Sequence, residues 1–223
     1  MRQRWRRFRR PAWLGTLRRT RPLSYHWGRE RGTPVDRYYI DQYLSANRAD
    51  IRGRVLEMMD TRYTTEFGSN VVSSDVLDID EANAGATIHA DLTGPNALPE
   101  RAFDCFVLTQ TLQFVYELEQ AIAGAHRSLG AGGVLLATMP AVSKIDRHAG
   151  FDGDYWRFTT ASATKAFSSS FGSENVSATA FGNVLAAVAF LMGMAVEELK
   201  PRELDFADDF FPVVIGVRAV RVD

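Results

Sequence analysis

Four carboxylates recur near segments of this sequence that have strand character. Glu57 lies within one short apolar run, Asp75 lies within the next, Asp91 follows a third, and Asp104 opens a fourth. At the end of the second strand of a parallel sheet, a carboxylate can accept hydrogen bonds from both hydroxyls of a ribose. An acid after the third strand can accept one from an adenine amino group. The pattern therefore indicates a nucleoside-binding edge.

The elements that would position these acids centre on residues 103–139. Residues 103–109 form an apolar run with β-branched and aromatic members, which is typical of a buried strand. Residues 117–129 have apolar side chains at helical spacing, with Gly130 at the expected stop. A second apolar strand then runs to residue 139. Strand, helix and strand with short connections predict a parallel sheet, whose ligands bind beyond the carboxyl ends of the strands.

The remaining segments extend this sheet. We expect a helix over residues 35–49, strands over 55–59, 71–76 and 86–91, and a helix over 160–171. A strand over 175–181, a buried helix over 184–199 and a final strand over 211–222 complete the series. This order predicts an α/β fold, with a doubly wound, mostly parallel seven-stranded sheet and an antiparallel last strand.

A family resemblance follows from these residues. Val55-Leu56-Glu57, Asp75, Ala90-Asp91-Leu92, residues 103–115 and Leu129-Gly130-Ala131-Gly132-Gly133 resemble the class I S-adenosylmethionine-dependent methyltransferases, of the type that includes ubiquinone-biosynthesis enzymes. The resemblance covers roughly residues 35–181 and the last strand. It implies S-adenosyl-L-methionine as the cofactor. The residues that it implies as cofactor ligands are Glu57, Asp60, Asp75, Asp91, Leu92 and Gln110.

The turn after the first strand departs from the family pattern. The family has a glycine-rich turn there, because glycine tolerates positive φ and lets the backbone approach the cofactor. Here the turn reads Met58-Met59-Asp60-Thr61-Arg62-Tyr63, with no glycine before Gly68. A methyltransferase fold without catalysis is therefore the alternative reading. Otherwise Asp60 or Thr61 is expected to contribute polar groups to the cofactor's amino-acid end.

Residues 144–159 follow the fifth strand and are rich in groups that can recognise a polyhydroxyl acceptor. Tyr155, Trp156 and Arg157 are expected to bind such an acceptor, and His148 or Asp154 to take its hydroxyl proton. The stretch around them resembles one in methyltransferases encoded with sugar-modifying and cell-surface polysaccharide enzymes. The alternative is structural: Trp156 and Phe158 fill the core and Arg157 pairs with Asp154.

The charge is distributed asymmetrically. Residues 1–37 contain twelve arginines against Glu30 and Asp36, although the whole chain has a net charge of -1. We therefore expect two parts: a basic, Arg- and Trp-rich arm over 1–34 and a methyltransferase-like domain over 35–223. Residues 1–22 are expected to be dispensable for folding. The arm either docks on the acidic body, contacts a membrane surface or contacts nucleic acid.

Composition excludes several classes. Cys105 is the one cysteine, so an internal disulfide is excluded, and its apolar strand predicts a buried, inert thiol. There is no Cys/His cluster for zinc, no phosphate-binding loop, no dinucleotide fingerprint and no apolar run that could span a bilayer. The acidic body disfavours nucleic acid. A cytoplasmic or membrane-peripheral location is expected, and the sequence does not indicate an oligomeric state.

The sequence thus predicts an S-adenosylmethionine-dependent methyltransferase acting on a small-molecule or glycan acceptor, with a sugar hydroxyl as the first candidate. The alternative is a non-catalytic binding or scaffold protein on the same fold.

Overall fold

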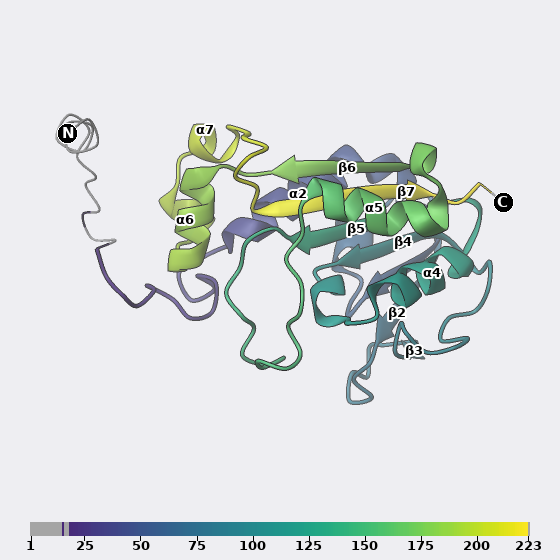
Figure 1. The fold of residues 1–223 in the computed structure, drawn as a ribbon. Coiled ribbons are helices and arrows are strands. Elements are labelled where there is room, and N and C mark those ends of the chain that lie inside the picture. Colours follow the sequence, from purple (N-terminus) through teal and green to yellow (C-terminus); the bar gives the residue numbers. More distant parts are fainter. Residues whose placement is uncertain (1–14, 16–17, 223) are drawn as a thin grey trace.

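The computed structural model describes residues 15 and 18–222. Within these residues, seven strands form one sheet in the order β3-β2-β1-β4-β5-β7-β6 (Figure 1). The strands are β1 (Gly53–Met58), β2 (Val71–Asp78), β3 (Ile88–His89), β4 (Phe103–Thr109), β5 (Leu129–Pro140), β6 (Val176–Phe181) and β7 (Val214–Val220). β1 to β5 pair in parallel, and β7 is antiparallel to both of its neighbours. This confirms the predicted fold class.

Helices cover both faces of the sheet. One apolar core lies under α4 (Leu118–Ser128) and α5 (Thr160–Phe171), and a second lies under α2 (Val35–Ala46), α3 (Arg62–Phe67) and α6 (Val184–Met192). Short elements complete the chain: α7 (Pro201–Leu204) and the 3-10 helices η2 (Arg48–Asp50), η3 (Leu112–Phe114), η4 (Ser173–Asn175) and η5 (Val196–Glu198).

The central strands are buried on both faces, as their continuous apolar runs require. Cys105 on β4 pairs with Val55 on β1 and Val134 on β5, and it is fully buried. Burial raises the pKa of its thiol, because the thiolate would lose its hydration. This agrees with the inert thiol expected from the sequence.

The helix expected over residues 184–199 is much shorter. α6 ends at Met192 because Gly193 adopts a left-handed conformation, with φ +71°, and a side chain there would meet the backbone of Ser24. The helix is also not fully buried, since Val184, Leu185, Val188 and Leu191 are exposed. The sequence also predicted a helix stop at Gly130. The helix, α4, ends at Ser128, and the nearby glycine with a positive φ is Gly132 at the start of β5.

The last part of the expected arm contacts the rest of the domain. Leu23 N donates to the carbonyl of Met192 on α6, and Thr33 bonds the carboxylate of Glu197 in η5. Pro34 forms a β-bridge with Ala195. Residues 23–34 therefore pack on the domain, and in Figure 1 this purple segment runs beside α6. Residues 1–14 and 16–17 of the expected arm lie outside the described residues.

Candidate functional site

The turn after β1 keeps the backbone shape of a glycine turn without a glycine. Met59 has φ +68°, in the left-handed region that favours glycine, and its side chain is 65% exposed. The next residue, Asp60, accepts a hydrogen bond from Arg62 N at 2.9 Å and caps the first turn of α3. The departure seen in the sequence therefore changes the side chain at this turn but leaves the left-handed backbone in place.

Glu57 holds that turn in place through hydrogen bonds to the start of α3. Its carboxylate is almost fully buried and accepts hydrogen bonds from the backbone N–H groups of Tyr63 and Thr64, at 2.8 and 2.7 Å. Burial raises the pKa of Glu57, and the hydrogen bonds from Thr64 and Tyr63 oppose this rise. Both oxygens therefore hold the start of α3, so Glu57 is placed to support the turn.

The acid at the carboxyl end of β2 is Asp78. The strand runs two residues further than expected, so Asp75 lies in its middle, paired with Leu56, and accepts a hydrogen bond from Thr87 Oγ1. At the strand end, Asn83 Nδ2 donates both to Asp78 Oδ2 and to the carbonyl of Met59, each at 2.8 Å. Asn83 thus ties the ends of β1 and β2 together.

The third strand is shorter than expected, and Asp91 follows it in a turn. Asp91 is exposed, and its Oδ1 accepts hydrogen bonds from the backbone N–H and hydroxyl of Thr93. The neighbouring Leu92 is buried in the core under α4. Of these two residues, Asp91 therefore offers the accessible polar atoms.

The ends of β4 and β5 and the start of α2 enclose a cavity of about 220 Å³. Three of its lining residues each carry a buried polar atom that has no hydrogen-bond partner among the described residues: Asp36 Oδ1, Gln110 Nε2 and Gln113 Oε1. Buried polar groups are otherwise nearly always paired, because leaving one unpaired costs about 1–3 kcal/mol. This cavity therefore suits a polar ligand.

Both amides are held by local geometry. Gln110 has φ +48°, and its N–H donates to the Thr138 carbonyl at 2.8 Å, so the chain turns sharply at the end of β4. Gln113 Nε2 in turn donates to the Gln110 carbonyl at 2.9 Å. Burial raises the pKa of Asp36, and the guanidinium of Arg37 opposes the rise. The carboxylate of Asp36 is therefore protonated more readily than that of an exposed aspartate.

The rest of the lining is strongly charged. It comprises Trp27, Arg29, Pro34, Arg37, Met59, Phe114, Pro140, Ser143, Lys144, Asp146, Asp154, Arg157 and Phe190. Lys144 Nζ lies 3.2 Å from the ring centroid of Trp27, whose Nε1 donates to Ser143 Oγ. Burial lowers the pKa of Lys144. Trp27 from the N-terminal segment and Lys144 from the loop after β5 therefore form one wall.

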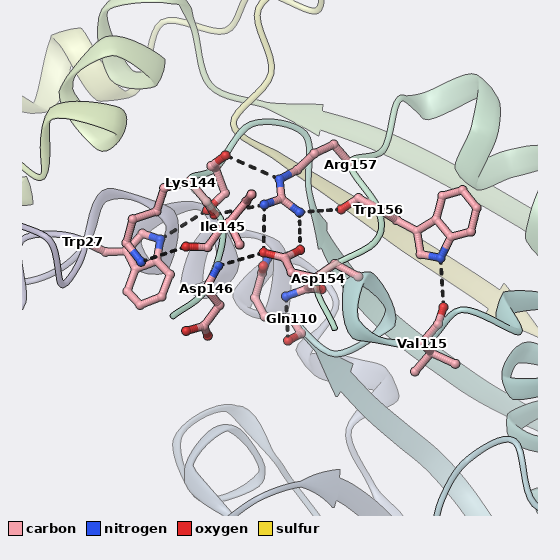
Figure 2. A network of polar contacts seen from close by, with 11 residues as sticks. Trp27, Gln110, Val115, Lys144, Ile145, Asp146, Asp154, Trp156 and Arg157 are labelled. Carbon is pink, nitrogen blue, oxygen red and sulfur yellow. Dashed lines mark hydrogen bonds and ion pairs between the residues drawn. The ribbon is translucent and has the colours of Figure 1, made fainter. Parts of the chain in front are cut away.

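The loop after β5 is held by one ion pair. Arg157 Nη1 and Nη2 lie 2.5 and 3.0 Å from the two oxygens of Asp154, whose side chain is only 2% exposed (Figure 2). Asp154 also accepts from Asp146 N, and Arg157 also donates to the Lys144 carbonyl. Burial raises the pKa of Asp154, but these bonds outweigh it and the net shift is downward. This geometry corresponds to the structural reading of the pair.

The two aromatic residues expected to bind the acceptor do not line the cavity. Trp156 Nε1 donates to the Val115 carbonyl at 2.9 Å, and its ring stacks on Tyr116 with centroids 6.0 Å apart. Tyr155 meets the same Tyr116 ring edge-on. Tyr155 N and Trp156 N both donate to the Gln113 carbonyl. Tyr155 and Trp156 therefore hold the loop against η3 and the residues that follow it. Arg157, in contrast, lines the cavity.

His148 is exposed in the loop, and its backbone N–H donates to Asp146 Oδ1. It is not among the residues that line the cavity. The structure therefore brings Gln110, Asp154 and Arg157 of the expected residues together, and it leaves His148, Tyr155 and Trp156 outside.

Three residues at this edge were missed by sequence reasoning: Asp36, Asn83 and Gln113. Asp78 is the nearest alternative to Asp75 and stands at the end of the longer second strand, and Asp36 lies in the acidic first turn of α2. Gln113 lies next to the expected Gln110 in a polar-apolar stretch that reads as the start of a helix. Asn83 carries no sequence signal, because its role depends on a loop folding back to Met59.

Two features are absent from the part of the chain that the structure describes. There, no group of three or more His, Cys, Asp or Glu side chains is arranged to hold a metal ion. Among those same residues, no helix has both the length and the apolar character needed to cross a bilayer.

The fold and this edge define an α/β domain of the class I methyltransferase type. Residues 52–137 match the family model described as a methyltransferase domain. The matched model and the fold indicate S-adenosylmethionine as the cofactor and methyl transfer as the reaction class. No functionally curated protein matches the chain.

Solved structures share the fold at low identity. An S-adenosylmethionine-dependent methyltransferase from Mesorhizobium loti is 19% identical, with a TM-score of 0.51 over 79% of this chain and 96% of the other. Phosphoethanolamine N-methyltransferase 2 from Haemonchus contortus, in complex with S-adenosyl-L-methionine, is 13% identical, with a TM-score of 0.55 over 82% and 53%. The [4+2]-cyclase SpnF is 14% identical, with a TM-score of 0.55 over 86% and 83%. These likenesses concern the fold.

The residues present fit a sulfonium nucleoside cofactor. The left-handed turn at Met59 is retained, a carboxylate stands at the end of β2, and an amide with an unpartnered Nε2 stands at the end of β4. A ribose, an adenine and an amino-acid group need such acceptors and donors. The cavity is small for a whole nucleoside ligand, which suits it to the reacting ends of donor and acceptor.

Proposed function

We propose that this protein transfers the methyl group of S-adenosylmethionine to a hydroxyl of a small polar acceptor, with a sugar as the first candidate. The observation that carries the proposal is the cavity in which Asp36 Oδ1, Gln110 Nε2 and Gln113 Oε1 are buried without partners among the described residues. A polar ligand in this cavity would satisfy all three.

The cofactor would be held along the ends of β1 to β4. The Met59 turn and Gln110 face its amino-acid end, Asp78 its ribose and Asp91 its adenine, with Glu57 and Asn83 keeping the turn and the strand end in place. When bound, S-adenosylmethionine supplies an activated methyl group. The work left to the protein is positioning and proton removal.

We assign proton removal to Asp36 rather than to His148 or Asp154. Asp36 is a lining residue of the cavity, its Oδ1 has no hydrogen-bond partner among the described residues, and burial raises its pKa, so it is more basic than an ordinary aspartate. Asp154 is held by Arg157, and its pKa is lowered. His148 points outside the lining residues.

The sugar acceptor rests on the chemistry of the cavity wall. Arg29, Arg37 and Lys144 offer donors, and Asp36 and Asp146 offer acceptors, within one small space. Such an alternation of donors and acceptors matches a polyhydroxyl ligand that carries an acidic or phosphate group. Nucleotide sugars and acidic glycans are therefore the first acceptors to screen.

A binding protein without methyl transfer is the second candidate, and Met59 is the observation that favours it. An exposed methionine side chain occupies the turn where the family has glycine. In that case the donor or its analogue would bind without turnover on any acceptor.

Titration calorimetry with S-adenosylmethionine and with S-adenosylhomocysteine tests the first step. We expect both to bind, because the contacts proposed for the nucleoside do not involve the methyl group. If neither compound binds, both candidate functions, the enzyme and the binding protein, are contradicted. Labelled donor incubated with nucleotide sugars and acidic glycans then separates them, since label transfer requires the enzyme and its absence across the panel favours the binding protein.

A further inference from the structure

A second hollow lies beside the cavity, on the outer side of the loop after β5. It has a volume of about 580 Å³ and is formed by the N-terminal segment, residues 144–151 and the end of α6. Arg19, Arg21 and Arg147 belong to its lining, and so do the apolar side chains of Phe151 and Leu191. We call this the Arg–Phe surface, defined by these five residues together with Tyr25 and Ile145.

The apolar part of the Arg–Phe surface is unusually exposed. Phe151 is 89% exposed, and Tyr25, Ile145 and Leu191 are each at least 40% exposed. Apolar area left in water costs about 25 cal/mol per Å², so a group of such side chains on one surface indicates a partner that covers them. In Figure 1, α6 and the loop after β5 lie at the same end of the sheet.

The charged part of the surface is positive. Among the described residues, Arg19, Arg21 and Arg147 form no ion pair with an acid, and Asp146 is the one carboxylate that lines the hollow. The guanidinium of Arg147 lies 4.4 Å from the ring centroid of Tyr25, which links the loop to the N-terminal segment. Three arginines are thus presented around exposed aromatic and aliphatic side chains.

We propose that the Arg–Phe surface binds the face of an anionic lipid bilayer. Exposed aromatic and aliphatic side chains enter the region between headgroups and acyl chains, and arginines pair with lipid phosphates. The sequence before the surface continues this chemistry, with six further arginines interleaved with Trp5 and Phe8 in residues 2–10. A nucleic acid would engage the arginines but would leave Phe151 and Leu191 in water.

Bilayer binding would also set the direction from which the acceptor arrives. Lys144 and Asp146 line both the hollow and the cavity. A protein held by the Arg–Phe surface therefore keeps the cavity close to the headgroup layer, where a membrane-associated glycan would enter it. This last step rests on the proposed function, whereas the binding itself does not.

Co-sedimentation of the full-length chain with vesicles tests the proposal without donor or acceptor, so its result is independent of methyl transfer. We expect binding to phosphatidylcholine vesicles that contain phosphatidylglycerol, weaker binding as salt rises, and none to phosphatidylcholine alone. The variant Arg19→Gln/Arg21→Gln/Arg147→Gln should bind about tenfold more weakly or worse. The matched control Arg48→Gln/Arg52→Gln/Arg127→Gln removes three exposed arginines elsewhere and should bind like the parent chain.

Equal losses in the two arginine variants would overturn the proposal in favour of charge alone, and no loss in either would place binding on residues 2–10. The variant Phe151→Ser/Leu191→Ser addresses the apolar part. It should weaken vesicle binding and leave binding to a short DNA duplex unchanged. If vesicle binding is unaffected by this variant, the surface does not dock on lipid.

A single probe can locate the contact. Because Cys105 is fully buried, Phe151→Cys gives one reactive thiol for an environment-sensitive dye. Its emission should shift to the blue when anionic vesicles are added. The same dye on Val72→Cys, at an 81% exposed position of β2, should not respond. A response at position 72 and none at position 151 contradicts the assigned face.

Discussion

Asp154 and Arg157 form a bidentate ion pair that closes the loop after β5 upon itself. Because the carboxylate is buried and the guanidinium also donates to three backbone carbonyls, the pair defines the wall that the loop gives to the cavity. We propose that its role is to position Lys144 and Asp146 rather than to exchange protons.

Asp154→Asn should loosen this loop. The change leaves Arg157 without its carboxylate, and we expect a loss of about 1–3 kcal/mol in local stability. Limited proteolysis should then cut within residues 144–154, while binding of S-adenosylmethionine is unchanged. A variant with an intact loop and a loss confined to kcat would instead identify Asp154 as the base.

The same pair makes the loop acid-sensitive. The pKa of Asp154 is lower in the folded chain than its ordinary value of about 3.9, so its contribution to stability is complete above that value. As pH falls through the lowered pKa, the carboxylate is protonated and the contribution is lost. Proteolytic protection of the loop should therefore persist at pH 5 and decline only in stronger acid; a decline that begins near neutrality is incompatible with the pair.

Asp36→Asn should abolish the proposed proton transfer. We expect kcat to fall by about 10²–10⁴ on a hydroxyl acceptor, with donor affinity unchanged. In the parent enzyme, kcat should fall as pH drops through the raised pKa of Asp36, above the range of an ordinary aspartate, because the protonated acid cannot accept the proton. Asp41→Asn is the matched control: its pKa is also raised by burial on α2, but it does not line the cavity. Equal effects of the two changes would point to α2 stability.

Asp78→Asn should weaken the binding of S-adenosylmethionine by about 1.5–3 kcal/mol, through loss of charged hydrogen bonds to ribose. Asp75→Asn should leave the affinity unchanged, because Asp75 lies in the middle of β2 and is bonded to Thr87. Calorimetry on the two variants distinguishes them. A loss for Asp75→Asn alone would restore the position expected from the sequence.

Met59 offers a test of the turn itself. Met59→Gly should alter the free energy of unfolding by no more than about 1 kcal/mol, since relief at positive φ offsets the added chain entropy. Met59→Val should cost more, because a β-branched residue is a steric outlier in the left-handed region. Chemical denaturation measures both, and equal stabilities would mean that the turn changes shape.

Deleting residues 1–22 should leave the melting temperature within a few degrees, as expected for roughly 1 kcal/mol or less. Deleting residues 1–34 should cost clearly more, because it removes the Trp27–Ser143 bond and the Thr33–Glu197 bonds. If the shorter deletion collapses the protein, the first 22 residues carry packing that the described contacts do not explain.

The sequence was sufficient for the sheet because its central strands are long, apolar and joined by one amphipathic helix. Gln110 directly follows β4 and Arg157 lies in the loop after β5; both were named from the sequence, and both line the cavity. The end of β2 was placed two residues early because polar residues hide the length of this strand, so Asp78 rather than Asp75 stands at its carboxyl end. Asp36 was not named, because α2 reaches the cavity only through tertiary packing.

The aromatic residues show a different limit. Tyr155 and Trp156 have the composition of a sugar-binding rim, but their partner Tyr116 lies about 40 positions earlier in the chain. Only the folded chain reveals that their rings are already occupied. Similarly, the helix expected to run to residue 199 ends at Met192. A side chain at the next position, Gly193, would meet the backbone of Ser24, and the sequence does not reveal this contact.

The wall that carries Trp27 has a consequence for how the protein is made. Thr33 bonds a residue that follows it by 164 positions, and Arg31 bonds Glu198. During synthesis the ribosome therefore releases this segment long before its binding surface on α6 and η5 exists. The Trp27 contacts with Ser143 and Lys144 can form earlier, but the bonds to η5 form only when the carboxyl-terminal part of the chain has emerged. A nascent chain without that part therefore lacks the bonds that hold residues 31–33 in place.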